Sequence, residues 1–291
     1  MGTDIVHANT SRLVSSRRVK KAVKRVPTYA VVFIVVAMFF FPILAMVMTS
    51  FKIPTDVFTL PARILPTEWT WENFEKALRA MPADRYLFNS VKIASLSVIG
   101  TLLSCPLVGY ALAKFRFRGR GVVFLLALGT MMLPPQVTMI PLYLVFSRIG
   151  LTGTIWPLVL PTFFGTPFFI FLMRQFFVSI PDDLVAAARL DGASEFRIYW
   201  NIMLPLARPA VATIGVFQFM WAWTDFLNPL IYLNNQANYT LVLGLYNFFS
   251  QTGISWGPLM AASSMFTLPA LVVFLLGQRF FLAGIATTGL K

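Results

Sequence analysis

Few residues in this chain could carry out covalent or metal chemistry. Its 291 residues include one histidine, His7, and one cysteine, Cys105. A metal site needs several nitrogen or sulfur ligands, and a nucleophile needs a neighbouring base. The phosphate-binding pattern GxxxxGK[ST] does not occur either. We therefore expect no catalytic site, metal or bound cofactor, and we interpret Cys105 as a packing residue.

A stretch of charged, alanine-rich chain stands out, "PDDLVAAARLDGASEFRIYWNIMLPLARP" at 181–209. Pro181 and the acids Asp182 and Asp183 suit the first turn of a helix, and Ser179 with Asp182 approximates a capping box. Gly192 then predicts the end of this helix and a turn.

A second short helix is expected directly after this turn. Ser194 can cap "EFRIYWNIML", in which Phe196, Trp200 and Met203 are spaced for one apolar face. A helix-turn-helix of this size cannot build its own core, so we expect it to dock on something. The alternative is a solvated connection.

Asp225 is the only acid that we place within an apolar span. An ionisable residue in a membrane is a functional-site hypothesis, and Lys92, expected at similar depth, is its nearest partner. Alternatively, both side chains reach towards the headgroup region.

Aromatic and amide side chains gather in the last two apolar segments and the loop between them. An uncharged polyhydroxy ligand needs such rings and amides, although membrane interfaces collect the same aromatics. The set comprises Trp221, Trp223, Asn228, Tyr232, Asn234, Asn235, Tyr246, Asn247 and Trp256.

Prolines interrupt another apolar segment, "MMLPPQVTMIP", at Pro134, Pro135 and Pro141. Non-helical backbone at membrane depth is tolerated where protein covers it or where it lines a cavity. The prolines therefore indicate a translocation pathway or a mobile gate, with a simple packing kink as the alternative.

The composition indicates that these residues are positioned by membrane helices. The chain is 57% hydrophobic and 12% charged, with a mean hydropathy of +0.73, whereas soluble domains carry about 25% charged residues. About twenty apolar residues span a bilayer, and helices satisfy the backbone there. We predict an all-α polytopic protein with six spans: 28–50, 88–113, 121–144, 155–173, 206–230 and 259–281.

The basic residues predict the orientation. They concentrate before the first span, in "KFRFRGR" at 114–120 and in 174–208, whereas 231–257 carries no charge. Basic loops stay cytoplasmic, so both termini are expected inside. The net charge of +13 is then a topology signal, and we expect contact with the lipid bilayer and none with nucleic acid.

The expected organisation is a cytoplasmic basic tail, 1–27, followed by one transmembrane domain, 28–291. Within that domain lie outer loops at 51–87 and 231–257 and a cytoplasmic loop at 179–205. In the first outer loop Thr70 is a candidate N-cap.

The cytoplasmic loop resembles the EAA loop of ABC importer permeases. Ala187 and Ala188 are followed at the expected spacing by Gly192 and then by Leu204-Pro205. "YALAKFRFRGR", "MMLPPQVTMIPLYL", "FLMRQFFVSIPDDL" and "WTDFLNPLIYL" are similar to the carbohydrate-importer branch, above all to the six-span maltose-type permease subunit.

This resemblance implies a type I ABC importer permease fold in a prokaryotic plasma (inner) membrane. It also implies three kinds of partner: a cytoplasmic ATPase dimer that binds ATP-Mg, a second permease subunit forming a heterodimer, and an extracytoplasmic sugar-binding protein. The loop residues it assigns to ATPase coupling are Asp182, Asp183, Ala186, Ala187, Ala188, Arg189, Asp191, Gly192, Ala193 and Phe196. Candidate pathway residues are Asp225, Trp221, Trp223, Asn228, Pro134, Pro135 and Lys92.

One departure from the family bears on docking. Ala186 replaces the glutamate that names the motif, and Asp182 and Asp183, one turn earlier, are expected to substitute on the same helix face. The alternatives are an ABC importer for another small solute, a proton-coupled secondary transporter using Asp225, and a scaffold that transports nothing.

Overall fold

The structure is a computed structural model that describes residues 4–61, 63–250 and 253–288. Side chains are described for residues 27–61, 63–249 and 253–280. His7, Lys291 and the basic side chains of the predicted tail lie outside these. The chain forms two compact units, Met1–Phe74 with Trp256–Ala261, and Glu75–Ser255 with Ala262–Lys291.

The first unit contains the long helix α1, Asp4–Ser50, and the 3-10 turn η1, Pro54–Asp56. Its loop is fixed by polar contacts. Asp56 accepts hydrogen bonds from the Thr67 backbone N–H (2.7 Å) and hydroxyl (2.8 Å), and these bonds lower the pKa of its carboxyl. The predicted cap is confirmed, since Thr70 Oγ1 accepts from Glu72 N at 3.1 Å, where α2, Glu72–Arg79, begins.

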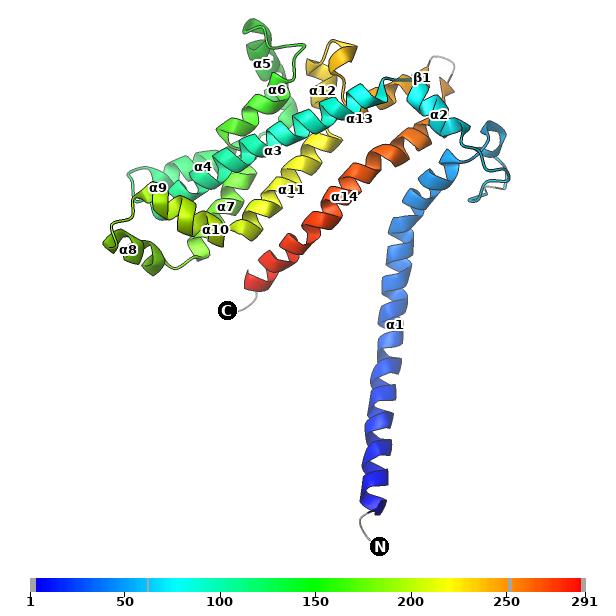
Figure 1. The fold of residues 1–291 in the computed structure, drawn as a ribbon, viewed down its shortest axis with the longest axis horizontal. Helices are drawn as coiled ribbons and strands as arrows, with labels where there is room; N and C mark the ends of the chain where they lie inside the picture. Colours follow the sequence, from blue (N-terminus) through cyan, green and yellow to red (C-terminus); the bar gives the residue numbers. More distant parts are fainter. Residues whose placement is uncertain (1–3, 62, 251–252, 289–291) are drawn as a thin grey trace. The chain divides into compact units, whose positions relative to one another are not determined.

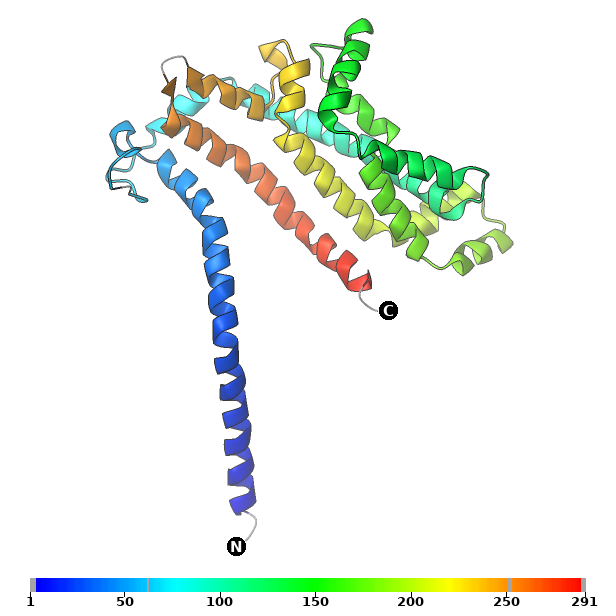
Figure 2. The ribbon, with the colours of Figure 1, turned by 180° about the vertical axis from the view of Figure 1, so that it is seen from behind.

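The second unit is organised around α3, Ala83–Lys114. Two helices pack along it, α7, Pro167–Ser179, and α11, Arg208–Thr224, and Figures 1 and 2 show them alongside it. Gly109 permits the approach of α7, because a Cβ at this position would lie 2.7 Å from Met173 Cβ. The core between these helices includes Cys105, Phe169, Met173 and Ile214, so the packing role predicted for Cys105 is confirmed.

The apolar helices agree with the predicted spans except where they break. Within the described residues, four helical segments are long and apolar enough to cross a membrane: Pro27–Ser50, Ala83–Lys114, Trp156–Ser179 and Trp256–Phe280. The last belongs to α14, Trp256–Thr288. The third of these segments is composed of α6, Trp156–Val159, the 3-10 turn η2, Leu160–Phe164, and α7.

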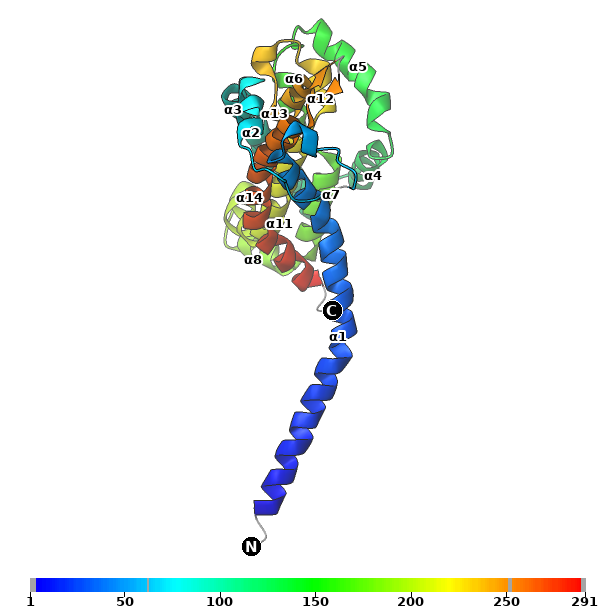
Figure 3. The same ribbon diagram turned by 90° about the vertical axis from the view of Figure 1, so that its right-hand side faces the viewer.

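The predicted span 121–144 is not one continuous helix. It consists of α4, Arg120–Thr130, and α5, Pro135–Arg148, with an angle of 98° between them, and this bend is visible in Figure 3. Pro134 and Pro135 lie at the break, as predicted, because the residue before a proline leaves the helical region. Pro141 lies inside α5, so its prediction as a third break was wrong.

The predicted span 206–230 is also interrupted. Its helix α11 meets the preceding helical stretch, Glu195–Leu206, at 78° and ends at Thr224. Asp225 therefore lies between α11 and α12, Leu227–Tyr232, and not within one spanning helix.

The second predicted outer loop contains short elements. They are η4, Gln236–Asn238, α13, Leu241–Gly244, η5, Leu245–Phe248, and a two-stranded hairpin of β1, Phe249–Ser250, and β2, Gly253–Ile254, with Phe249 paired to Ile254. Buried side chains of α3 fix this loop: Asn89 Nδ2 donates to the backbone oxygens of Ala237 and Tyr239.

Candidate functional site

The predicted helix-turn-helix is present between α7 and α11. It comprises α8, Asp182–Leu190, α9, Glu195–Ile198, the π-helical turn η3, Tyr199–Met203, and α10, Leu204–Leu206. We call residues 181–204 the docking loop.

Local chemistry shapes the turn of the docking loop as the sequence predicts. Gly192 has φ +79°, a conformation that side chains disfavour. Gly192 N donates to Arg189 O and Ala193 N to Ala188 O, both at 3.0 Å, which is the Schellman pattern that closes a helix. The predicted Ser194 cap is confirmed, since its Oγ accepts from Arg197 N at 3.4 Å.

The predicted cap at Ser179 was wrong. This residue ends α7, and its hydroxyl donates to Phe176 O at 2.7 Å. The N-cap position of α8 is Pro181, without a side-chain cap. A serine hydroxyl in the last turn of a helix bonds back to a preceding carbonyl, so it was unavailable to α8.

One face of the docking loop joins the core, and the other is exposed. Val185, Ala188 and Ile198 are buried in the cluster that also contains Phe177 of α7. The exposed face includes Asp183, Leu184, Ala186, Ala187, Leu190, Asp191, Phe196 and Trp200. Leu190 is 89% exposed and Phe196 69%. Such apolar exposure beside polar residues is typical of an interaction surface.

The predicted single apolar face of the second helix is divided. Met203 is fully buried, whereas Phe196 and Trp200 point outwards and stack on each other, with ring centroids 6.2 Å apart. The π-helical turn at Tyr199–Met203 explains this, because it changes the angular spacing on which the prediction rested.

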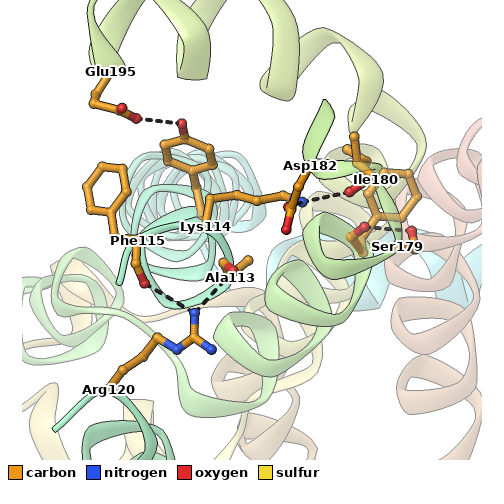
Figure 4. A network of polar contacts seen from close by, with 10 residues as sticks. Ala113, Lys114, Phe115, Arg120, Ser179, Ile180, Asp182 and Glu195 are labelled. Atoms are coloured by element: carbon orange, nitrogen blue, oxygen red, sulfur yellow. Dashed lines mark hydrogen bonds and ion pairs between the residues drawn. The ribbon is translucent and has the colours of Figure 1, made fainter. Parts of the chain in front are cut away.

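Lys114 at the end of α3 fixes the start of α8. Its Nζ donates to Ile180 O and to Asp182 Oδ1, each at 2.6 Å, as Figure 4 shows. The Lys114 side chain is only 3% exposed. This contact lowers the pKa of the Asp182 carboxyl. Asp182 therefore has a partner within the chain, although 79% of its side chain is still exposed. Asp183 is also exposed, and the expectation that these acids substitute for the missing glutamate stays a prediction.

A second polar contact fixes the turn between the two helices. Arg189 Nε donates to Glu195 Oε1 at 2.6 Å, and the Tyr110 hydroxyl of α3 donates to Glu195 Oε2 at 3.1 Å. The bond to Glu195 raises the pKa of Arg189. Sequence reasoning missed Tyr110, Lys114 and Glu195, because their partners are 66 to 85 positions distant.

Two basic residues that predicted the topology also form hydrogen bonds with backbone carbonyl oxygens at the C-terminal end of α3. Arg120 Nη1 donates to Phe115 O at 3.1 Å and to Ala113 O at 3.5 Å (Figure 4). Arg174 Nε donates to Leu112 O at 3.3 Å. Cations at a helix C-terminus satisfy its free carbonyls and favour its dipole.

Asp225 and Lys92 do not pair. Both Asp225 oxygens accept from Asn228, from its side-chain nitrogen at 2.8 Å and its backbone N–H at 3.2 Å. Lys92 is exposed, and no ion pair joins it to Asp225 among the described side chains. The predicted pairing was wrong; the short spacing from Asp225 to Asn228, at the start of a helix, was the available signal.

The other predicted pathway residues are spread over several environments. Trp223 is buried, and its Nε1 donates to Phe266 O at 3.1 Å. Trp221 stacks on Phe169 at 4.8 Å and borders a small cavity of about 110 Å³. This cavity is lined by Ile93, Ser97, Leu158, Gln218, Trp221, Ala222, Asp225 and Pro229. Pro134 and Pro135 are exposed at the bend of α4 and α5.

Several long apolar helices define a helical multi-pass membrane protein, and the docking loop exposes apolar side chains. The chain belongs to the family described as binding-protein-dependent transport system inner membrane component, whose model matches residues 106–285. It is thus a transport subunit and not an enzyme.

Similar proteins agree with this family. The chain is 35% identical to the probable ABC transporter permease protein YurM of Bacillus subtilis, over 86% of this chain and 83% of that protein. It is 34% identical to the arabinooligosaccharides transport system permease protein AraQ of Halalkalibacterium halodurans, over 86% and 91%. A chain of a bacterial ABC transporter involved in alginate import has the same fold, with a TM-score of 0.78, 23% identity and coverage of 90% and 98%.

Proposed function

We propose that this chain is the transmembrane permease subunit of an ATP-driven carbohydrate importer in a prokaryotic plasma membrane. The observation that carries the coupling part is the docking loop, whose exposed apolar face is held by buried contacts to α3 and α7. An ATPase subunit with an apolar cleft would cover Leu190, Phe196 and Trp200. ATP-Mg binds to that partner and not to this chain.

The carbohydrate substrate is inferred from the relatives. Their names include arabinooligosaccharides and diacetylchitobiose. One relative, 31% identical, is named for sn-glycerol-3-phosphate, which supports a phosphorylated polyol as the second candidate. Uptake of labelled neutral oligosaccharides and of glycerol phosphate into reconstituted vesicles distinguishes the two.

The proposed assembly has six spans, with each bent helix pair counted as one, and both termini in the cytoplasm. The basic residues around 114–120 and 174–208 support this orientation. A second permease chain completes the pathway as a heterodimer, and an extracytoplasmic binding protein delivers the substrate to the loops at 51–87 and 231–257. Labelling of cysteines placed at residues 118 and 235 from each side of sealed vesicles tests the orientation.

Copurification of the chain with the ATPase tests the coupling. The comparison is between the native chain, Gly192→Pro, which disrupts the turn, and Asp183→Arg, which reverses an exposed charge on α8. Glu68→Arg, an exposed reversal in the loop predicted to face outwards, is the matched control. We expect the ATPase with the native chain and the control, and its loss from both docking-loop variants. An ATPase that binds all four equally would refute coupling through this loop.

A further inference from the structure

Helix α3 has polar contacts to the docking loop at one of its ends. Tyr110 and Lys114, one turn apart, reach Glu195 at the start of α9 and Asp182 at the start of α8. Both α8 and α9 are therefore attached to the C-terminal end of α3. Lys114 also donates to Ile180 O, so its buried ammonium group has two partners at the start of α8.

The opposite end of α3 is attached to the segment 237–241. Asn89 Nδ2 donates to Ala237 O at 2.8 Å and to Tyr239 O at 3.0 Å, and Ser90 Oγ accepts from Leu241 N at 2.8 Å. Both side chains are buried. These bonds satisfy backbone groups that burial would otherwise leave unpaired, so the segment is fixed to α3.

The two attachments are joined by one uninterrupted helix. Lys114 lies 25 positions after Asn89 (89 to 114), a rise of about 38 Å along an α-helix. This is close to the roughly 40–45 Å between the polar surfaces of a bilayer. Although Pro106 lies between the two sets of contacts, α3 continues through it as one helix, unlike the two bent helix pairs.

We propose that Lys114 and Tyr110 are positioning residues through which movement of the docking loop displaces α3 and, with it, the segment 237–241. The proposal rests on the proposed function, in which an ATPase binds the loop and a binding protein approaches the opposite side. Because coupling is reciprocal, occupation of the outer loop would act back on the ATPase through the same contacts.

The test uses the complete transporter in lipid nanodiscs, with the ATPase, partner permease and binding protein. ATP hydrolysis is measured with and without the binding protein and its substrate. Lys114→Met keeps most of the apolar length of the side chain but removes the ammonium group and both hydrogen bonds. We expect it to retain the ATPase and lose about tenfold in stimulation by the binding protein, since a hydrogen bond to a charged group contributes about that factor or more.

Three further single variants and one double variant make the result specific. Lys114→Arg is expected to restore most of the stimulation, and Arg118→Met, which removes a nearby exposed cation, to leave it unchanged. Asn89→Leu is expected to reduce stimulation, and its combination with Lys114→Met to be clearly less than additive, because both act on the same connection.

The outcomes separate the two proposals. Native stimulation in Lys114→Met with the ATPase bound overturns this inference alone. Loss of the ATPase from that variant also overturns it, because Lys114 would then only shape the docking surface. Failure of the native chain to retain any ATPase refutes the proposed function itself.

Discussion

Leu190 offers the most direct measure of the docking surface. It lies at the end of α8, on the exposed face, and 89% of its surface is accessible. Replacement by serine therefore removes almost no contact within this chain, and exposed substitutions change the unfolding free energy by only about 0.5 kcal/mol or less. Any large effect of this substitution on binding must therefore come from lost contact with a partner.

The size of that effect follows from burial. Complete burial of a leucine side chain contributes about 1.5–3 kcal/mol, and each 1.4 kcal/mol corresponds to about a tenfold change in affinity. If the ATPase covers Leu190, Leu190→Ser should weaken its binding about ten- to hundredfold. Titration of the nanodisc-embedded transporter subunits with fluorescent ATPase gives the dissociation constant.

The matched control is Phe117→Ser. Phe117 is also an exposed apolar side chain and lies in the connection between α3 and α4, on the side that we propose to be cytoplasmic, but outside the docking loop. The Phe117→Ser variant should bind the ATPase with native affinity. Equal dissociation constants for Leu190→Ser and the native chain would refute the assignment of this face, whatever the transport activity.

Three further predictions concern other parts of the chain. Gly109→Val should lower the thermal unfolding temperature in detergent, because the new Cβ would lie 2.7 Å from Met173 Cβ. Overpacking of this kind costs about 1–3 kcal/mol. An unchanged unfolding temperature would contradict the close packing of α3 and α7. The contact with Lys114 lowers the pKa of Asp182 below its ordinary 3.8, so its contribution to stability is complete above pH 3.8 and is lost as the pH falls through the lowered pKa. Hydrogen exchange at the start of α8 should therefore rise only in that acidic range. Asp182→Asn should abolish this pH dependence. Asp225→Asn should retain substrate uptake, since the Asp225 carboxylate accepts hydrogen bonds from the nearby Asn228. Uptake by the native chain should not require a proton gradient. If native uptake requires that gradient and the variant loses it, the proton-coupled alternative is favoured.

Local features of the fold could be predicted from the sequence because their causes are local. Apolar runs of about twenty residues require helices in lipid, and Pro134 with Pro135 interrupts one such run. The turn of the docking loop depends on Gly192 and the Ser194 cap, both of which act on residues within a few positions. The family resemblance was also recognisable, because each of its motifs is a short stretch of sequence.

The tertiary structure alone decided which side chains the docking loop presents. Phe196 and Met203 belong to one predicted stripe, but a π-helical turn exposes the first and buries the second. Asp182 has the charge expected of a docking residue, and it forms an ion pair with Lys114, 68 positions away. Pairings of this kind depend on how α3, α7 and the loop pack together. Hydrophobic periodicity specifies which face of a helix is buried, but not which distant polar group it meets there.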